Sequence, residues 1–166
     1  MVHERNFSKT FDLVDESSTI LYGQALAQRC QRLKLLEPGL VIYLEGDLGM
    51  GKTCFSRAFI QHFLPGQRVK SPTYTLIESY TTNEWCIHHF DLYRLCQPEE
   101  LEYLGVRDLL THDYIALIEW PNKAKGFLPP ADISIEIYQA EEGRKLKLQG
   151  CSALVRQQWS DFVSMF

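Results

Sequence analysis

The feature that most constrains the fold of this chain is the stretch LVIYLEGDLGMGKTCFSRAFIQHF, which begins at Leu40. A glycine-rich segment separates its apolar beginning from its helix-like end. Residues 40–45 form a short, nearly continuous apolar run, which is typical of a strand buried on both faces. Residues 53–63 have the pattern of a helix that stops at a Pro-Gly pair. Between them stands GDLGMGKT, whose glycines allow backbone angles that side chains would obstruct.

GDLGMGKT fits the pattern G-x-x-x-x-G-K-[ST]. In such a loop the backbone N–H groups surround phosphate oxygens, and the start of the following helix favours an anion. Lys52 can reach the β- and γ-phosphates, and the hydroxyl of Thr53 can bind Mg²⁺. A chance match in a chain of this length is expected roughly once in two hundred. The loop residues predicted to bind a nucleotide are Gly46, Asp47, Leu48, Gly49, Met50, Gly51, Lys52, Thr53 and Cys54.

Strand-like and helix-like segments alternate along the rest of the chain. Strands are expected over residues 8–14, 40–45, 73–80, 84–93, 114–120, 132–138 and 144–150. Helices are expected over residues 20–36, 53–63, 98–110 and 153–166. Two pairs of strands are separated by short polar turns, which indicates two hairpins. The sequence therefore predicts an α/β, P-loop NTPase-like layered fold, with a mixed central β-sheet flanked by helices.

Composition limits the classes of protein to consider. With 166 residues, 45% of them apolar and 23% charged, residues 1–166 are expected to form a single P-loop domain. The net charge of −4 gives no reason to expect direct binding of nucleic acid or of an anionic membrane. The five cysteines are scattered without a C-x-x-C pair, which fits a reducing cytosol. No apolar run approaches the roughly 18 residues of a membrane span, so we expect a cytoplasmic protein.

Phosphoryl transfer also needs a metal-positioning acid and a group that orients the attacking oxygen. The strand predicted at 114–120 brings Glu119 to its end, in a Walker-B-like position. The segment HHFDLYR offers Asp91, and strand alternation places His89 on the same face as Asp91 and His88 on the other. Two alternatives stay open: Glu119 as a solvent-facing strand-end carboxylate, and a zinc site built from the histidines and Asp91.

One segment indicates whether the bound nucleotide carries adenine or guanine. Proteins that bind GTP use an N-K-x-D element, whose carboxylate accepts from the guanine edge. The segment NKAK at residues 122–125 has Lys125 in place of that acid. The sequence therefore favours adenine, with ATP or ADP as the nucleotide and Mg²⁺ as the metal.

Further segments carry a more specific signal than the phosphate loop alone. GDLGMGKT, SPTYTL (residues 71–76), HFDLYRL (89–95), EELEYLG (99–105) and LIEWP (117–121) follow one another along the chain. Their order and near-spacing resemble the TsaE family, small bacterial P-loop ATPases required for threonylcarbamoyladenosine modification of tRNA. The resemblance covers roughly residues 15–144, which is most of the chain.

The resemblance implies roles for residues at the matching positions. Lys52 corresponds to the phosphate-binding lysine and Thr53 to the Mg²⁺ ligand. Glu119 corresponds to the second acid of the Mg²⁺ site, directly or through water. Thr73 falls in a switch-like segment that would sense the γ-phosphate, and Asp91 would position or activate the attacking water.

The resemblance assigns roles less specifically to residues at the edges of the nucleotide site. Trp120 would border the nucleotide, with plain packing as the alternative role. The turn at residues 15–17, including Glu16, and Arg144 are candidates for the base pocket; an ordinary solvated hairpin arginine is the alternative for Arg144. Met50 stands where the family has a small residue, and its side chain is expected to point away from the phosphates.

The resemblance also implies a working context. Members of the family are thought to couple ATP hydrolysis to a TsaB–TsaD-like pair that performs the tRNA chemistry. Such a subunit would hydrolyse ATP slowly alone and would touch tRNA at most indirectly. Two other classes stay open. A small-molecule kinase would need a lid carrying arginines; Arg94 and Arg107 are available, but no arginine-rich lid segment stands out. A nucleotide-gated binding module would use Asp91 only structurally.

Overall fold

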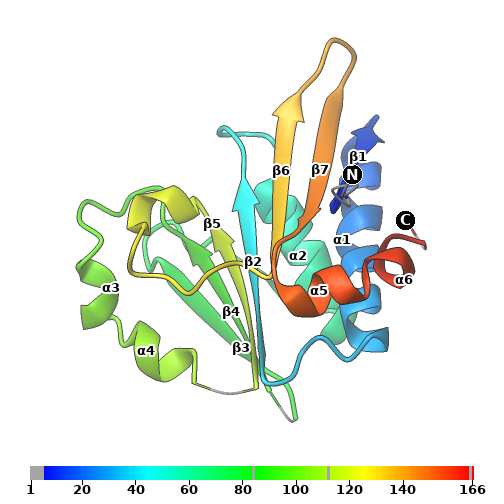
Figure 1. Cartoon of the computed structure of the whole chain (residues 1–166). Helices are drawn as coiled ribbons and strands as arrows, with labels where there is room; N and C mark the ends of the chain where they lie inside the picture. Colours follow the sequence, from blue (N-terminus) through cyan, green and yellow to red (C-terminus); the bar gives the residue numbers. More distant parts are fainter. Residues whose placement is uncertain (1–5, 84, 112, 165) are drawn as a thin grey trace, which may run out of the picture.

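A seven-stranded mixed β-sheet forms the centre of the molecule (Figure 1). The structure, a computed structural model, describes residues 6–83, 85–111, 113–164 and 166. The strands are β1 (Ser8–Leu13), β2 (Gly39–Glu45), β3 (Ile77–Thr81), β4 (Cys86–Asp91), β5 (Tyr114–Glu119), β6 (Ile133–Gln139) and β7 (Arg144–Gly150). Their order is β1-β7-β6-β2-β5-β4-β3, with parallel pairs from β6 to β4 and antiparallel pairs at both edges. The predicted α/β class and mixed sheet are confirmed.

Helices cover both faces of the sheet (Figure 1). They are α1 (Glu16–Arg32), α2 (Lys52–Phe63), α3 (Glu100–Tyr103), α4 (Val106–Leu109), the 3₁₀ segment η1 (Pro121–Ala124), α5 (Ala153–Gln157) and α6 (Trp159–Val163). Strand β5 shows how the faces divide: Ile115 and Leu117 join the core that contains α1 and α2, whereas Ala116 and Ile118 join the core that contains α3, α4 and η1. This alternation decides which side chains can reach the glycine loop.

Helix α1 is fixed at its start and along its length. The carboxylate of Asp15 accepts a hydrogen bond from the backbone N–H of Ser18 at 2.9 Å, which caps the first turn. Further along, a Cβ on Gly23 would lie 2.7 Å from the carbonyl oxygen of Phe55 in α2. The glycine therefore permits the close contact between α1 and α2, and α1 is held beside the start of α2.

Several predicted helix boundaries are wrong. The first helix runs over 16–32 and not 20–36, because the Asp15 cap starts it earlier. The helix predicted over 98–110 is two short helices, α3 and α4, separated by Gly105 with a φ of +72°. The helix predicted over 153–166 is α5 and α6 joined at Gln158. Of that last prediction, Met165 lies outside the described residues.

The strand predictions are correct in order but too long in the middle of the chain. The predicted strand 73–80 begins only at Ile77, because the preceding residues turn and Leu76 has a φ of +66°. The predicted strand 84–93 is ordered as a strand over 86–91, and Glu84 lies outside the described residues. Both predicted hairpins, β3–β4 and β6–β7, are confirmed. Residues 71–76 are thus an irregular segment beside the end of β4.

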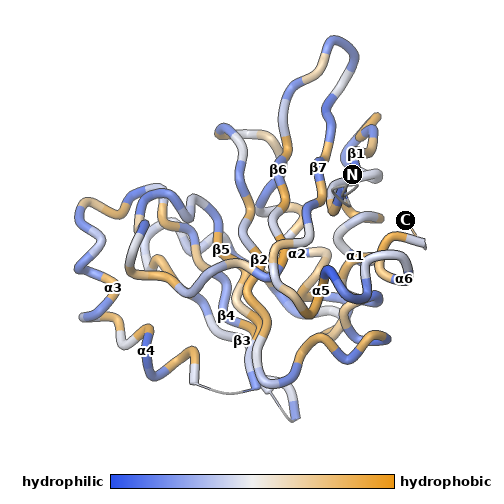
Figure 2. Tube along the Cα trace, viewed as in Figure 1, coloured by the Kyte–Doolittle hydropathy of each residue, from blue (hydrophilic) through white to orange (hydrophobic). Residues whose placement is uncertain are grey.

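Hydrophobic residues concentrate where the central strands cross the middle of the molecule, and the tip of the β6–β7 hairpin is hydrophilic (Figure 2). Phe11, Tyr22, Phe162 and Phe166 pack ring against ring, with centroids 4.9–6.4 Å apart, and so tie the end of the chain to β1 and α1. Among the described residues, no helix is both long and apolar enough to cross a bilayer.

Candidate functional site

The glycine loop connects the end of β2 to the start of α2. Gly46 has a φ of +143°, and a Cβ there would collide with the carbonyl oxygen of Ile137 in β6. Gly51 has a φ of +106° and occupies the position before the first residue of α2. Both positions require glycine, for close approach in one case and for a left-handed backbone in the other. The loop therefore has the shape that the motif predicts.

The side chain of Lys52 folds back into the loop. Its ammonium donates hydrogen bonds to the carbonyls of Gly46 and Asp47, the latter at 3.0 Å. The residue is 5% exposed, and burial lowers the pKa of Lys52. Among the described residues, no carboxylate lies within ion-pair distance of this ammonium, so its hydrogen-bonding partners there are neutral. An anion placed in the loop would supply the missing negative charge.

A chain of hydrogen bonds links α2 to two neighbouring strands. The hydroxyl of Thr53 donates to Glu119, with distances of 3.1 and 3.3 Å to the two carboxylate oxygens. The Oε2 atom of Glu119 lies 2.5 Å from Nε2 of His89 on β4. Glu119 and His89 are buried, at 2% and 0% exposure. The acid at the end of β5 therefore faces the loop, and the solvent-facing alternative for Glu119 is wrong.

Asp91 lies beside this chain because β4 and β5 run parallel and end together, with Asp91 opposite Glu119 in register. One carboxylate oxygen of Asp91 accepts from the backbone N–H of Tyr93 at 3.1 Å. Burial raises the pKa of Asp91. The hydroxyls of Ser71 and Thr73 are 2.7 Å apart in the irregular segment that faces the same space.

These groups surround one cavity of about 340 Å³ at the start of α2, which we call the inner cavity. Its lining residues are Leu48, Gly49, Met50, Gly51, Lys52, Thr53, Cys54, Ser71, Thr73, Asp91, Glu119 and Trp120. The cavity brings cationic, hydroxyl and carboxylate groups together from the glycine loop, the 71–76 segment and the ends of β4 and β5. That combination suits a phosphate group with its metal.

Trp120 forms one edge of the inner cavity. Its backbone is left-handed, with a φ of +60°, and it links the end of β5 to Pro121. The indole ring lies 4.2 Å from Nζ of Lys52 and 5.0 Å from the ring centroid of Tyr93. A non-glycine residue in this conformation is uncommon, and such positions cluster at functional sites. Trp120 therefore packs against Lys52 and Tyr93 and also lines the cavity, and its contact with a nucleotide stays a prediction.

A second space, which we call the outer cavity, lies on the other side of the loop and measures about 410 Å³. Arg144 Nη1 donates to the carbonyl of Met50 at 3.0 Å, so the start of β7 is tied to the loop. The thiol of Cys54 lies 3.8 Å from a carboxylate oxygen of Glu16, and burial raises the pKa of Cys54. The lining residues are Leu13, Val14, Asp15, Glu16, Thr19, Gly51, Cys54, Gly143 and Arg144.

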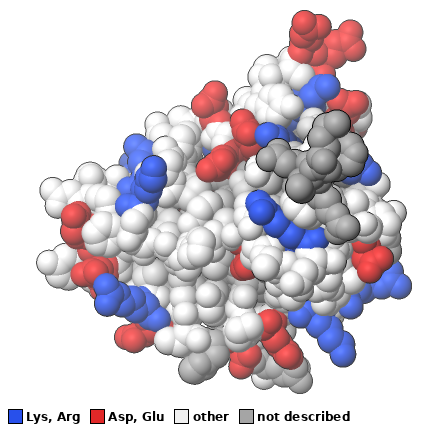
Figure 3. Space-filling view, in the orientation of Figure 1, with Lys and Arg blue, Asp and Glu red and all other residues white. Residues whose placement is uncertain are grey.

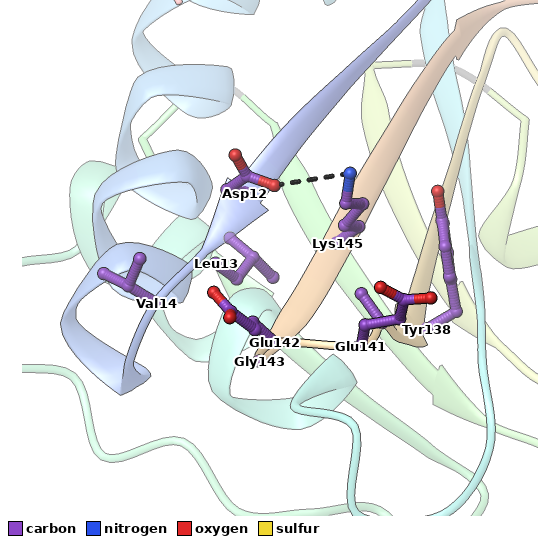
Figure 4. Close-up of a pocket in the computed structure, with 9 residues that line it drawn as sticks. Asp12, Leu13, Val14, Tyr138, Glu141, Glu142, Gly143 and Lys145 are labelled. Carbon is purple, nitrogen blue, oxygen red and sulfur yellow. Dashed lines mark ion pairs between the residues drawn. The ribbon is translucent and has the colours of Figure 1, made fainter.

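The β6–β7 hairpin adds a more open pocket next to the outer cavity (Figure 4). The two share Leu13, Val14 and Gly143. Asp12 and Lys145 form a surface ion pair at 3.6 Å across this pocket. Acidic side chains gather at the hairpin tip, where Glu141 and Glu142 lie (Figures 3 and 4). The hairpin thus forms a mixed-charge rim around the outer cavity.

The predicted site residues fall into two groups. The loop residues from Leu48 to Cys54 line the inner cavity, together with Thr73, Asp91, Glu119 and Trp120. Glu16, Cys54 and Arg144 line the outer cavity. Gly46 and Asp47 line neither, but their carbonyls hold the lysine. Met50 packs partly against the core of α1 and α2, and its carbonyl accepts from Arg144.

Sequence reasoning missed the contact of His89 with Glu119 and the buried Thr19 of the outer cavity. Strand alternation placed His89 on the same face as Asp91, but it could not identify Glu119 on β5 as the partner of His89. His88 points to the opposite face, where its Nδ1 lies 2.7 Å from the hydroxyl of Ser79. This geometry does not bring the two histidines to one zinc ion.

The donors of the inner cavity fit Mg²⁺. The hydroxyl of Thr53 and the carboxylate of Glu119 are hard oxygen ligands, which magnesium prefers. They already face one another at 3.1 Å beside the lysine that would hold phosphate. The arrangement therefore fits a Mg–phosphate group, with further positions left for phosphate oxygens and water.

Comparison with known proteins gives consistent matches. The family model described as threonylcarbamoyl adenosine biosynthesis protein TsaE matches residues 13–146. A Haemophilus influenzae protein named tRNA threonylcarbamoyladenosine biosynthesis protein TsaE is 44% identical over 141 residues, covering 85% of this chain and 89% of that protein. A Rickettsia felis protein of the same name is 36% identical over 152 residues, covering 91% and 82%. In fold, the crystal structure of Bacillus subtilis YdiB matches with a TM-score of 0.74 over 93% of both chains, at 23% identity.

Proposed function

This chain belongs to the TsaE family of tRNA threonylcarbamoyladenosine biosynthesis, and we propose that it binds and hydrolyses Mg-ATP to support that modification. The observation that carries the proposal is the inner cavity. There the Lys52 ammonium, the Thr53–Glu119 pair and the Asp91 carboxylate face one space at the start of α2. Each group has a distinct task in phosphoryl transfer.

The loop and Lys52 hold the phosphates. The first N–H groups of the twelve-residue helix α2 have no partner within the helix, and they point toward the loop. Lys52 exchanges its neutral carbonyl partners for β- and γ-phosphate oxygens, which are stronger acceptors. Binding the triphosphate also offsets the cost of burying this charge, because burial lowers the pKa of Lys52.

Thr53 and Glu119 would hold Mg²⁺, Thr53 through its hydroxyl and Glu119 directly or through water. The ion neutralises charge on the β- and γ-phosphate oxygens when it is bound. Thr73 stands across the cavity in the irregular 71–76 segment, where its hydroxyl can reach the γ-phosphate. Because this segment has few regular backbone hydrogen bonds, it can rearrange when the γ-phosphate is present.

Asp91 is assigned to the chemical step. Its carboxylate accepts a hydrogen bond from the attacking water and orients it in line with the γ-phosphorus. The water oxygen forms a bond to phosphorus and gives a proton to the Asp91 carboxylate, while the bond from phosphorus to the β–γ bridging oxygen breaks, releasing ADP and phosphate. Burial raises the pKa of Asp91, which makes it a better proton acceptor than a solvated aspartate.

The outer cavity is assigned to the adenine and ribose. It adjoins the inner cavity through Gly51 and Cys54, which line both. Glu16, Arg144 and Cys54 supply polar groups around an apolar wall of Leu13 and Val14. Residues 122–125 do not line this cavity, so its lining does not by itself distinguish adenine from guanine.

The protein partner is assigned to the open side of the inner cavity. Leu48 at the loop tip is 60% exposed and Tyr74 beside Thr73 is 84% exposed. Exposed apolar groups at a cavity mouth favour coverage by another protein. A TsaB–TsaD-like pair would order the 71–76 segment and exclude water, so turnover alone would be slow. On the face shown in Figure 3, basic and acidic side chains are interspersed, which supports at most indirect contact with tRNA.

The alternative classes have weaker support. A small-molecule kinase needs arginines that close over the phosphates. Arg107 instead pairs with Glu102 on the surface at 3.0 Å, and Arg94 lies 4.7 Å from the ring centroid of Tyr74. Neither lines the inner cavity. In a binding module without hydrolysis, Asp91 would serve only its hydrogen bond to the Tyr93 N–H, although its side chain also lines the inner cavity.

The test is phosphate release from Mg-ATP by wild type and Lys52→Ala, each alone and with a purified TsaB–TsaD pair. We expect slow release by the wild type, faster release with the pair, and none by the variant. ATP affinity should fall more than AMP affinity in Lys52→Ala, because only ATP presents β- and γ-phosphates. Equal release by both proteins would reject the proposal.

A further inference from the structure

We propose that His89 is a positioning residue of the nucleotide site, whose imidazole holds the Glu119 carboxylate in the orientation that the Mg²⁺ site requires. The inference rests on the function proposed above, because it concerns the same metal site. It adds a residue on β4 that neither touches the nucleotide nor lines either cavity. His89 would act only through Glu119.

The first observation is the direction in which Glu119 reaches. In the parallel register of β4 and β5, Glu119 stands opposite Asp91, whereas His89 stands opposite Leu117. Yet the carboxylate contacts His89, two positions back along β4, at 2.5 Å. The Glu119 carboxylate is thus held at the position of His89, two residues back along β4 from Asp91.

The second observation is how the two oxygens of Glu119 are used. His89 contacts Oε2, and Thr53 lies nearest to Oε1 at 3.1 Å. The carboxylate is therefore fixed from both sides, by a strand on one and by the first turn of α2 on the other. Its plane is set before any ion arrives. Residues that orient metal ligands in this way commonly change metal affinity or activity by about 10- to 100-fold when they are lost.

The third observation is that the ring makes no second hydrogen bond within the described part of the chain. His89 is fully buried, and its Nδ1 has no hydrogen-bonding partner among the described residues. A carboxylate only accepts hydrogen bonds, so Nε2 is the donor in the contact with Glu119. A buried polar atom without a partner costs folding free energy, which an apolar side chain would avoid. The histidine is therefore explained by its bond to Glu119.

His88 provides a matched control. It is the neighbouring residue, is also buried at 4% exposure, and bonds Ser79 on the opposite face of the sheet. Replacing either histidine by leucine removes a buried ring of the same size from the same strand. Only His89→Leu removes a donor from Glu119. A difference between the two variants thus separates positioning from general loss of packing.

The experiment is ADP binding measured by calorimetry without metal and then across a Mg²⁺ titration, for wild type, His89→Leu, His89→Gln and His88→Leu. We expect similar metal-free ADP affinity in all four. His89→Leu should need about 10- to 100-fold more Mg²⁺ for the metal-dependent gain in affinity. His89→Gln keeps an N–H donor of similar reach, so its Mg²⁺ requirement should lie close to that of the wild type. His88→Leu should have the same Mg²⁺ requirement as the wild type. If His89→Leu does not fold, His89→Asn, whose amide is too short for Glu119, takes its place with the same expected loss.

Three results would overturn the inference. One is a Mg²⁺ requirement in His89→Leu equal to that of the wild type. Another is an equal loss in His88→Leu, which would make the effect one of packing. A third is a lack of rescue by His89→Gln. Failure of the proposed function would look different, because the wild type itself would then show no Mg²⁺-dependent gain in nucleotide affinity.

Discussion

The ammonium of Lys52 lies 4.2 Å from the centroid of the Trp120 ring and at the same time donates to two carbonyls of its own loop. The lysine opens α2 and the tryptophan follows β5, so the contact joins two elements that a triphosphate would lie between. Phosphate oxygens are stronger acceptors than neutral carbonyls or a ring face. Nucleotide binding is therefore expected to change this contact.

The fluorescence of Trp120 should report nucleotide binding. When Lys52 moves toward phosphate, the charge next to the indole changes, and the emission should change with it. We expect a saturable signal on titration with Mg-ATP in the wild type. Trp85 and Trp159 pack at other places, against Phe63 and Phe162. Trp120→Phe should therefore abolish the signal, and a full signal in that variant would contradict the assignment.

Metal dependence should separate Thr53 and Glu119 from the phosphate-binding residues. Thr53→Ala and Glu119→Gln should each weaken Mg²⁺-dependent nucleotide binding more than metal-free ADP binding, because they remove oxygen ligands. Thr53→Ser keeps the hydroxyl and serves as the control. Titrations with and without Mg²⁺ measure the difference. Equal losses under both conditions would show that these residues do not serve the metal.

Arg144 should contribute to nucleotide affinity through the outer cavity. Its guanidinium holds the Met50 carbonyl at 3.0 Å and lines the space assigned to adenine and ribose. A hydrogen bond from this charged group to the nucleotide would contribute about 1.5–3 kcal/mol, so we expect Arg144→Ala to weaken ADP binding about tenfold or more. Lys145→Ala on the same strand removes only a surface ion pair with Asp12 (Figure 4). Calorimetry should show near-normal affinity for that control; equal losses would argue against a role for Arg144.

Asp91→Asn should stabilise the protein in the absence of nucleotide. Burial raises the pKa of Asp91, so the folded state disfavours its ionisation relative to the unfolded state. This cost is fully present above the folded pKa and disappears below the ordinary value of 3.8. We therefore expect a higher melting temperature for Asp91→Asn at pH 7, with the gap closing as the pH falls toward that value. Thermal unfolding by circular dichroism measures it, and a lower melting temperature at pH 7 would contradict the expectation.

The parts of the site that follow from local sequence could be predicted. The phosphate loop is encoded by glycines at positions where the backbone requires them, as at Gly46 and Gly51. The face shared by His89 and Asp91 follows from strand alternation alone. The buried character of β2 and β5 was visible in their apolar runs. Each of these predictions depends on residues that are close in sequence.

The parts that depend on strand order could not be predicted. The contact between His89 and Glu119 exists because β4 lies next to β5 in the sheet. The sequence of neither strand indicates which strand will lie beside it. The outer cavity likewise needs the start of β7 beside the glycine loop, which brings Arg144 to Met50. The predicted length of the helix over residues 98–110 was wrong for a local reason. Gly105 has a left-handed backbone and divides a helical sequence pattern that has no other interruption.

The measurement that tests the central claim most directly is phosphate release by Asp91→Asn together with its affinity for Mg-ATP. Asparagine keeps the shape of Asp91 and the acceptor for the Tyr93 N–H, but it loses the charge that orients water. General-base and orienting contributions are worth roughly a hundred- to ten-thousand-fold in rate. We expect wild-type affinity, or slightly tighter binding, with turnover lowered by that factor both alone and with partners. Near-normal turnover with weakened binding would contradict the account and would assign the chemistry to another group.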